Sequence, residues 1–204
     1  IGVRLVGSEM CIRDREQTIH VLYSYEELLQ KTYSLIREPQ IKHVSQLIGE
    51  HTRIFLYGFG SSGLAAQEFQ LRLLRLGMDA EAITELHQMV LNEARITNAC
   101  LVIGISLSGA TRELIDALDR AKARGAAVIY LTSSNAEREK RTYEEIVLAP
   151  VKKNLEYGNV ISPQFPILLI LDLIYAQLLK EDRRSTEAQY DTHIWERIKD
   201  YHVG

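Results

Sequence analysis

The chain has 204 residues, of which 46% are hydrophobic and 25% charged, which is ordinary globular usage and enough to bury one core. Its 24 Lys and Arg against 27 Asp and Glu give a formal net charge of −3, whereas domains that bind nucleic acid by themselves usually carry a basic excess. The two cysteines, Cys11 and Cys100, match no metal or redox spacing, so we expect a reducing cytoplasm and no bound metal.

The first fifteen residues, IGVRLVGSEMCIRDR, show neither clean helical nor strand periodicity and lack the order of a secretory signal. They resemble translated adapter sequence, so we predict that residues 1–15 are non-native or disordered and that the native N-terminal part is missing. Residues 16–48 follow a helical pattern that Pro39 interrupts, and Gly49 is expected to end it.

From residue 49 onward, short apolar runs alternate with helical patterns. Near-continuously apolar strands are typical of a parallel sheet covered on both faces. The pattern therefore predicts an α/β fold, a three-layer αβα sandwich around a five-stranded parallel sheet. We expect strands over 53–57, 79–84, 99–105, 127–131 and 146–149, and helices over 64–76, 87–94, 110–124, 137–143, 164–180 and 190–201.

The most apolar stretch, residues 165–179, has to be tested as a membrane span. It is interrupted by Asp172 and Gln177 and is shorter than the ~20 residues that a span needs, so we predict a buried helix and no membrane association. This helix and the loop before it could supply a dimer face, and simple core packing is the alternative.

The segment GFGSSG, residues 58–63, follows the first expected strand and precedes a helix. It satisfies the G-x-G-x-x-G fingerprint of dinucleotide-binding proteins, and Glu85 falls 22 residues beyond Gly63, near the place of a ribose-binding acid. An NAD-binding Rossmann protein is therefore one alternative. Two features count against it, because a pyrophosphate-binding turn does not require Ser61 and Ser62, and the dinucleotide fold needs no second hydroxyl-rich loop.

That second loop is SLSGAT, residues 106–111, after the third expected strand. A helix N-terminus offers unpaired N–H groups and the positive end of the helix dipole. Gly109 lets the backbone approach an anion, while Ser106, Ser108 and Thr111 add short neutral donors. The simpler interpretation is that Ser108 caps the helix and Ser106 completes a turn. Three hydroxyls around a glycine, facing a Ser-Ser-Gly loop, favour a phosphate-binding site.

In this βαβ spacing, GFGSSG and SLSGAT resemble the sugar isomerase (SIS) domain over about residues 45–180. The resemblance implies a flavodoxin-like sheet, a phosphorylated sugar as ligand and no cofactor. It also implies that the phosphate is bound by Ser106, Ser108, Gly109 and Thr111. Contacts to the sugar or its phosphate from the first loop would come from Ser61 and Ser62.

The stretches LRLLRLGMDAEAITELHQM and GNVISPQFPILLILDLIY resemble the SIS half of RpiR/MurR-type transcriptional regulators. In those proteins a helical linker joins a SIS sensor to an N-terminal helix-turn-helix domain. The resemblance implies a linker over 16–48, a SIS domain over 49–183, a helical tail over 184–204 and a missing DNA-binding domain.

The same resemblance implies a homodimer or higher homo-oligomer that binds DNA only through the missing domain. It also implies that His87 contacts the sugar. One departure is visible, because Glu85-Leu86-His87 stands where many such sensors have Asp-Ser-His, and the serine hydroxyl is absent.

An aldose–ketose isomerase must move a proton between adjacent carbons and needs a base within reach of the substrate. The candidates near strand ends are Glu85, His87, Glu113 and Glu156, and each has a simpler interpretation. Glu113, for example, suits the dipole of the first helical turn. The sequence does not indicate that these candidate acids and bases come together in one site. We therefore expect a non-catalytic sensor, assign no catalytic residue and keep a sugar-phosphate isomerase as the alternative.

Overall fold

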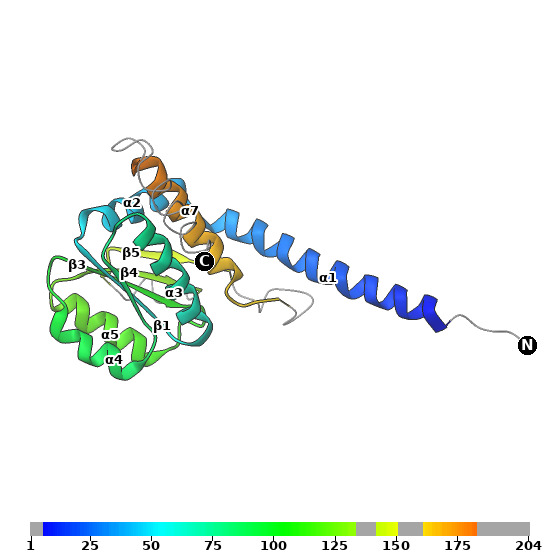
Figure 1. Cartoon of the computed structure of the whole chain (residues 1–204), viewed down its shortest axis with the longest axis horizontal. Helices are drawn as coiled ribbons and strands as arrows, with labels where there is room; N and C mark the ends of the chain where they lie inside the picture. Colours follow the sequence, from blue (N-terminus) through cyan, green and yellow to red (C-terminus); the bar gives the residue numbers. More distant parts are fainter. Residues whose placement is uncertain (1–5, 134–141, 151–160, 183–204) are drawn as a thin grey trace, which may run out of the picture.

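The computed structural model describes residues 6–133, 142–150 and 161–182 (Figure 1). Five parallel strands form one sheet in the order β2-β1-β3-β4-β5, which is the flavodoxin-like order. The α/β class and the five-stranded parallel sheet are therefore confirmed. The strands are β1 (Arg53–Gly58), β2 (Ala80–Ile83), β3 (Cys100–Ser106), β4 (Ala127–Thr132) and β5 (Glu145–Leu148).

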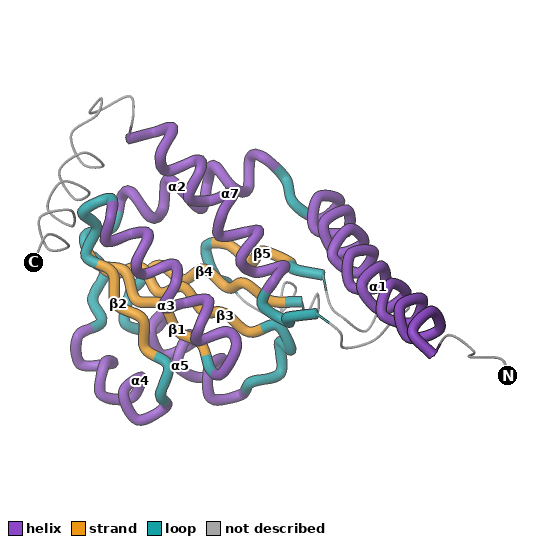
Figure 2. Tube along the Cα trace, turned by 45° about the vertical axis from the view of Figure 1, so that its right-hand side comes forward, coloured by secondary structure: helices purple, strands orange, loops and turns teal. Residues whose placement is uncertain are grey.

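Helices cover both faces of the sheet, as Figures 1 and 2 show. One face packs against α2 (Glu38–Glu50), α3 (Gly60–Arg75) and α7 (Phe165–Asp182), and the other against α4 (Leu86–Asn92) and α5 (Arg112–Ala123). Alternate residues of β1 separate the two cores, since Leu56 belongs to the first and Phe55 to the second. The three-layer arrangement follows from strands that are apolar on both sides.

Helix α1 (Val6–Leu35) begins ten residues before the expected start at Glu16 and extends away from the sheet (Figure 1). The expected interruption near Pro39 is present, but the break lies at residues 36–37 and Pro39 occupies the first turn of α2. Proline is tolerated there because first-turn amides have no partner within the helix. The hypothesis that residues 1–15 are non-native stays a prediction.

Helix α7 is a core helix, as predicted from Asp172 and Gln177 within its apolar run. Its buried face packs in the core with α2 and α3, and none of the helices in the described part of the chain has the length and apolar character of a membrane span. The buried residues of this face are Ile167, Ile170, Leu171, Ile174 and Leu178.

Three element predictions need correction or lie, wholly or in part, outside the described residues. The helix expected over 64–76 begins at Gly60, so the GFGSSG loop is mostly the first turn of α3 rather than a separate turn. The helix expected over 190–201 lies outside the described residues, as do residues 137–141 of that expected over 137–143.

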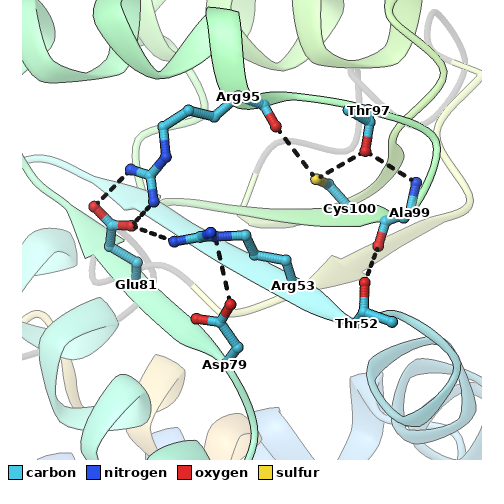
Figure 3. Close-up of polar contacts among 8 residues, drawn as sticks. All are labelled: Thr52, Arg53, Asp79, Glu81, Arg95, Thr97, Ala99 and Cys100. Atoms are coloured by element: carbon cyan, nitrogen blue, oxygen red, sulfur yellow. Dashed lines mark hydrogen bonds and ion pairs between the residues drawn. The ribbon is translucent and has the colours of Figure 1, made fainter.

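A cluster of charged side chains lies at the amino end of the sheet (Figure 3). Arg95 donates to Glu81 at 2.9 Å, and Arg53 reaches the same carboxylate at 3.4 Å and Asp79 at 3.6 Å. The hydrogen bond from Arg95 lowers the pKa of Glu81, although burial opposes it. Cys100 is only 3% exposed beside this cluster, so it is a core residue.

Candidate functional site

The carboxyl ends of β1 and β3 lie side by side at the point where the strand order reverses. Gly58 is in register with Ile105, and Ser106 is in register with Thr132 of β4. The chain leaves β1 toward β2 on one side and continues from β3 toward β4 on the other. Ligands of open α/β sheets bind at such a position, because the diverging connections leave a crevice there.

In the loop after β3, three hydroxyl groups converge. Ser106 is 4% exposed, and its Oγ lies 3.3 Å from Ser108 Oγ and 3.1 Å from Thr111 Oγ1. Gly109 has a φ of 64°, a conformation that favours glycine, and its N–H donates to the Ser106 carbonyl at 3.2 Å. The structure therefore brings together all four residues that the sequence assigns to a phosphate site.

The helix-cap interpretation of Ser108 is wrong. Helix α5 begins at Arg112, its N-cap is Thr111, and no side chain caps it by a hydrogen bond. Ser108 Oγ instead accepts a hydrogen bond from the Ala110 N–H at 3.3 Å, which closes a small turn before the helix. Since the first amides of a helix have no partner within it, the uncapped end of α5 adjoins the hydroxyl cluster.

In the loop after β1, two glycines allow the backbone of α3 to pack closely against the end of the strand. A Cβ atom on Gly58 would lie 2.8 Å from the Ser62 carbonyl oxygen, and one on Gly63 would lie 2.9 Å from the Gly58 oxygen. Ser61 is exposed and Ser62 is half-buried, and neither hydroxyl hydrogen-bonds to another residue in the described part of the chain. The hydroxyls of Ser61 and Ser62 are therefore available to donate hydrogen bonds to a ligand.

His87 lies at the same edge of the sheet, in the first turn of α4 after β2, and its side chain is exposed. Because β1 separates β2 from β3, the first loop stands between His87 and the second loop. A Cβ atom on Gly63 would lie 2.9 Å from Thr84 Cγ2, so the β2–α4 connection abuts the first loop. Glu85 is the exposed N-cap of α4.

The other candidate acids do not join a catalytic constellation in the described residues. Glu113 is exposed in the first turn of α5, and Glu156 lies outside the described residues. The described residues contain no group of three His, Cys, Asp or Glu side chains that could hold a metal ion. The NAD-binding alternative also loses support, because the dinucleotide-binding fold has strand order 3-2-1-4-5-6, in which the first and third strands in the sequence are not neighbours.

Sequence reasoning missed two residues beside the hydroxyl cluster. Ser133 follows β4 and its hydroxyl donates to the Leu107 carbonyl, so it ties the second loop to the next strand. Arg112 is the first residue of α5, is exposed, and forms no ion pair with the described residues. A cation at a helix N-terminus opposes the helix dipole, and this unfavourable placement was the signal that could have drawn attention to it.

Several solved structures share this fold. The sugar isomerase domain of an RpiR transcription factor from Sphaerobacter thermophilus has a TM-score of 0.74 and 21% identity, and covers 82% of this chain and 92% of its own. Vibrio vulnificus NanR, solved in complex with ManNAc-6P, has a TM-score of 0.75 and 22% identity, and the match covers 89% of this chain and 67% of the NanR chain. Phosphoheptose isomerase from Neisseria gonorrhoeae has a TM-score of 0.64 and 18% identity, with coverage of 80% and 98%.

At the sequence level, the chain is similar to an uncharacterised HTH-type transcriptional regulator from Haemophilus influenzae. The two are 30% identical over 153 residues, which are 75% of this chain and 53% of that protein. The chain thus spans about half the length of this relative. The model of the SIS domain family matches residues 46–165. Because this match covers more than half of the sequence, the chain belongs to the SIS domain family.

Proposed function

We propose that this chain is the effector-binding part of an RpiR-type regulator of carbohydrate metabolism, and that it binds a phosphorylated sugar without converting it. The observation that carries the proposal is the hydroxyl cluster of Ser106, Ser108 and Thr111 at the uncapped N-terminus of α5. Neutral hydroxyls and backbone amides suit a phosphate, whose oxygens accept several hydrogen bonds at once.

In this proposal the phosphate is held by Ser106, Ser108, Thr111 and the backbone at Gly109. The sugar extends toward the loop after β1, where Ser61 and Ser62 have hydroxyls without partners among the described residues. His87, on the far side of that loop, contacts the distal part of the sugar. NanR, which shares the fold, is solved with a phosphorylated amino sugar, and this supports the ligand class.

The regulatory role is supported by the HTH-type relative, of which this chain matches about half. A helix-turn-helix domain preceding α1 would bind DNA, and α1 would be the linker. The effector acts by binding one arrangement of two subunits more tightly than another, since a ligand shifts an equilibrium only through differential affinity. In this proposal the protein acts in the cytoplasm as a homodimer or higher homo-oligomer.

Sugar-phosphate isomerisation is the second candidate, because a phosphoheptose isomerase has the same fold. It requires an acid or base that reaches the carbons next to the carbonyl. Glu113, two residues after Thr111, is the described carboxylate nearest in sequence to the hydroxyl cluster. Incubation with each sugar phosphate that binds, followed by detection of the ketose or aldose partner, distinguishes the two functions. Turnover that is abolished in Glu113→Gln would establish the enzyme.

Calorimetric titration with a panel of sugar phosphates tests the phosphate site. We expect at least one to bind and Ser108→Ala to weaken it by about 1.5–3 kcal/mol, the contribution of one hydrogen bond to a charged group. Thr97→Ala is the matched control, because Thr97 Oγ1 accepts from the Ala99 N–H at 3.3 Å in the same kind of turn, before β3 rather than after it. Equal affinities of both variants and the wild type would rule out this site.

A further inference from the structure

A buried polar pair, Tyr57 and Asn92, joins β1 to α4. Asn92 Nδ2 donates a hydrogen bond to Tyr57 Oη over 2.8 Å, and the two residues are 2% and 1% exposed. Tyr57 directly precedes Gly58, the last residue of β1, and Asn92 is the last residue of α4. This hydrogen bond therefore connects the strand that leads into the first loop with the helix that carries His87.

The surroundings of the pair are apolar. Tyr57 belongs to the core cluster between the sheet and helices α4 and α5, together with Ile83, Met89 and Leu114. Among the described residues, the Oδ1 atom of Asn92 is buried without a hydrogen-bond partner. Such an atom is destabilising, whereas replacement of both members of a buried pair by apolar groups of the same shape can be nearly neutral. The stability of the fold therefore does not explain why this core contains an asparagine.

Helix α4 has few buried contacts that could fix its position. It is seven residues long, and its buried residues are Met89 and Asn92. Its other large apolar side chains, Leu86, Val90 and Leu91, are exposed. A helix of this length is not stable by itself, and apolar burial is not directional. A hydrogen bond does require a particular geometry, so the bond from Asn92 selects one position of α4 on the sheet.

The position of α4 in turn determines that of His87. This side chain is exposed and forms no hydrogen bond with the described residues, so the backbone of α4 sets where the imidazole lies. His87 and Asn92 are five residues apart, about 7.5 Å along a helix. A displacement of α4 at Asn92 is therefore transmitted to His87 and to the β2–α4 connection, which abuts the first loop at Thr84.

We propose that Tyr57 and Asn92 are positioning residues, whose hydrogen bond holds α4 so that His87 reaches the sugar part of the ligand. The inference rests on the proposed function and goes beyond it. It assigns to a buried pair outside the site the discrimination between a sugar phosphate and inorganic phosphate. Inorganic phosphate at the second loop is too small to reach α4, because β1 separates β2 from β3.

Calorimetric titration of the 204-residue chain tests the proposal, with inorganic phosphate and with the sugar phosphate of the panel that binds most tightly. Tyr57→Phe/Asn92→Leu removes both polar groups and keeps similar side-chain volumes. We expect about tenfold weaker binding of the sugar phosphate, unchanged binding of inorganic phosphate and no loss of stability in urea. Tyr130→Phe is the control, because it removes a buried hydroxyl from the same cluster, where the ring packs edge-on against Tyr143 rather than on α4.

A second titration determines whether the effect passes through His87. His87→Ala should weaken the sugar phosphate by a similar factor, and Tyr57→Phe/Asn92→Leu introduced into His87→Ala should cause no further loss. Effects of residues that act through one another are not additive. A loss that persists in the His87→Ala background would overturn the proposal, because the pair would then act on the first loop. Equal weakening of inorganic phosphate would overturn it as well.

Failure of this inference is distinguishable from failure of the proposed function. If no sugar phosphate binds to the wild type, both fail. If one binds to the wild type and to Tyr57→Phe/Asn92→Leu with equal affinity, the inference alone fails. Should the double variant be unstable, Tyr57→Phe by itself gives the same comparison, because it removes the hydrogen bond with the loss of one oxygen atom.

Discussion

The two ends of the sheet satisfy their polar groups in opposite ways. At the amino end, Arg53 and Arg95 form ion pairs with the carboxylates of Asp79 and Glu81 (Figure 3). At the carboxyl end, the second loop has neutral hydroxyls that bond mainly to each other, and the first has hydroxyls without partners in the described residues. Charges that are paired stabilise the fold, whereas unpaired donors can be completed by a ligand.

The difference indicates which substitutions should change stability and which should change binding. Changes at the amino end should act on the free energy of unfolding alone. Changes of hydroxyls at the carboxyl end should act on affinity for sugar phosphate, because their bonds to one another are exchanged for bonds to phosphate. Gly58 and Gly63 are exceptions at the carboxyl end. Substitution of either should change the free energy of unfolding, because α3 packs closely on β1 at these positions.

Gly63→Val is expected to have the largest effect. Its Cβ atom would lie 2.9 Å from the backbone oxygen of Gly58, so α3 would have to move away from β1. We expect a loss of about 3 kcal/mol in the free energy of unfolding, measured by urea denaturation. Gly49→Val is the control, because nothing lies within 4 Å of a Cβ atom on Gly49. Equal stability of the two variants would contradict the close packing of the first loop.

Ser106→Ala should reduce the affinity for a bound sugar phosphate by about 2 kcal/mol, because it removes the hydroxyl that bonds to both Ser108 and Thr111. Calorimetry measures the affinity and urea denaturation the accompanying change in stability. The comparison predicts a larger change in binding than in unfolding. The reverse order would show that these hydroxyls serve the fold rather than a ligand.

Glu81→Gln should cost about 1 kcal/mol of stability at neutral pH and leave sugar-phosphate affinity unchanged, because the ion pairs at the amino end are partly exposed. The pKa of Glu81 is lowered in the folded state, mainly by the hydrogen bond from Arg95. Its contribution is therefore present above the ordinary pKa near 4.5 and is lost as the pH falls through the lowered value. The unfolding curves of variant and wild type should converge in acid.

Arg112→Gln should have the smallest effects, a small gain in stability and a small loss in phosphate affinity. Removal of a cation from the N-terminus of α5 should stabilise the ligand-free protein by about 0.5 kcal/mol, because the cation opposes the helix dipole. The same change should weaken phosphate binding slightly and reduce its salt dependence. Titrations at low and high salt measure this, and an unchanged salt dependence would place Arg112 outside the reach of the phosphate.

Much of this architecture could be predicted because local pattern and global fold agree. The apolar run of β3 and the hydroxyls after it are visible in the sequence, and parallel strands necessarily bring their carboxyl ends to one edge. The start of α3 was misplaced because Gly60 to Gly63 read as a turn, whereas packing against β1 draws them into the helix. Arg112 was overlooked because the helix was expected to begin at residue 110, whereas α5 begins at Arg112 itself.

By itself, the sequence determined the α/β class, the two loops and the residues that converge after β3. These depend on the periodicity of apolar residues, on the positions of glycines and on where the strands end. Only the tertiary structure decided that Ser108 bonds within its own turn rather than capping α5, and that Leu28 of α1 is buried against the residues that precede α7. The physical reason is that periodicity shows which residues are apolar, whereas the packing of distant elements decides which of them are buried.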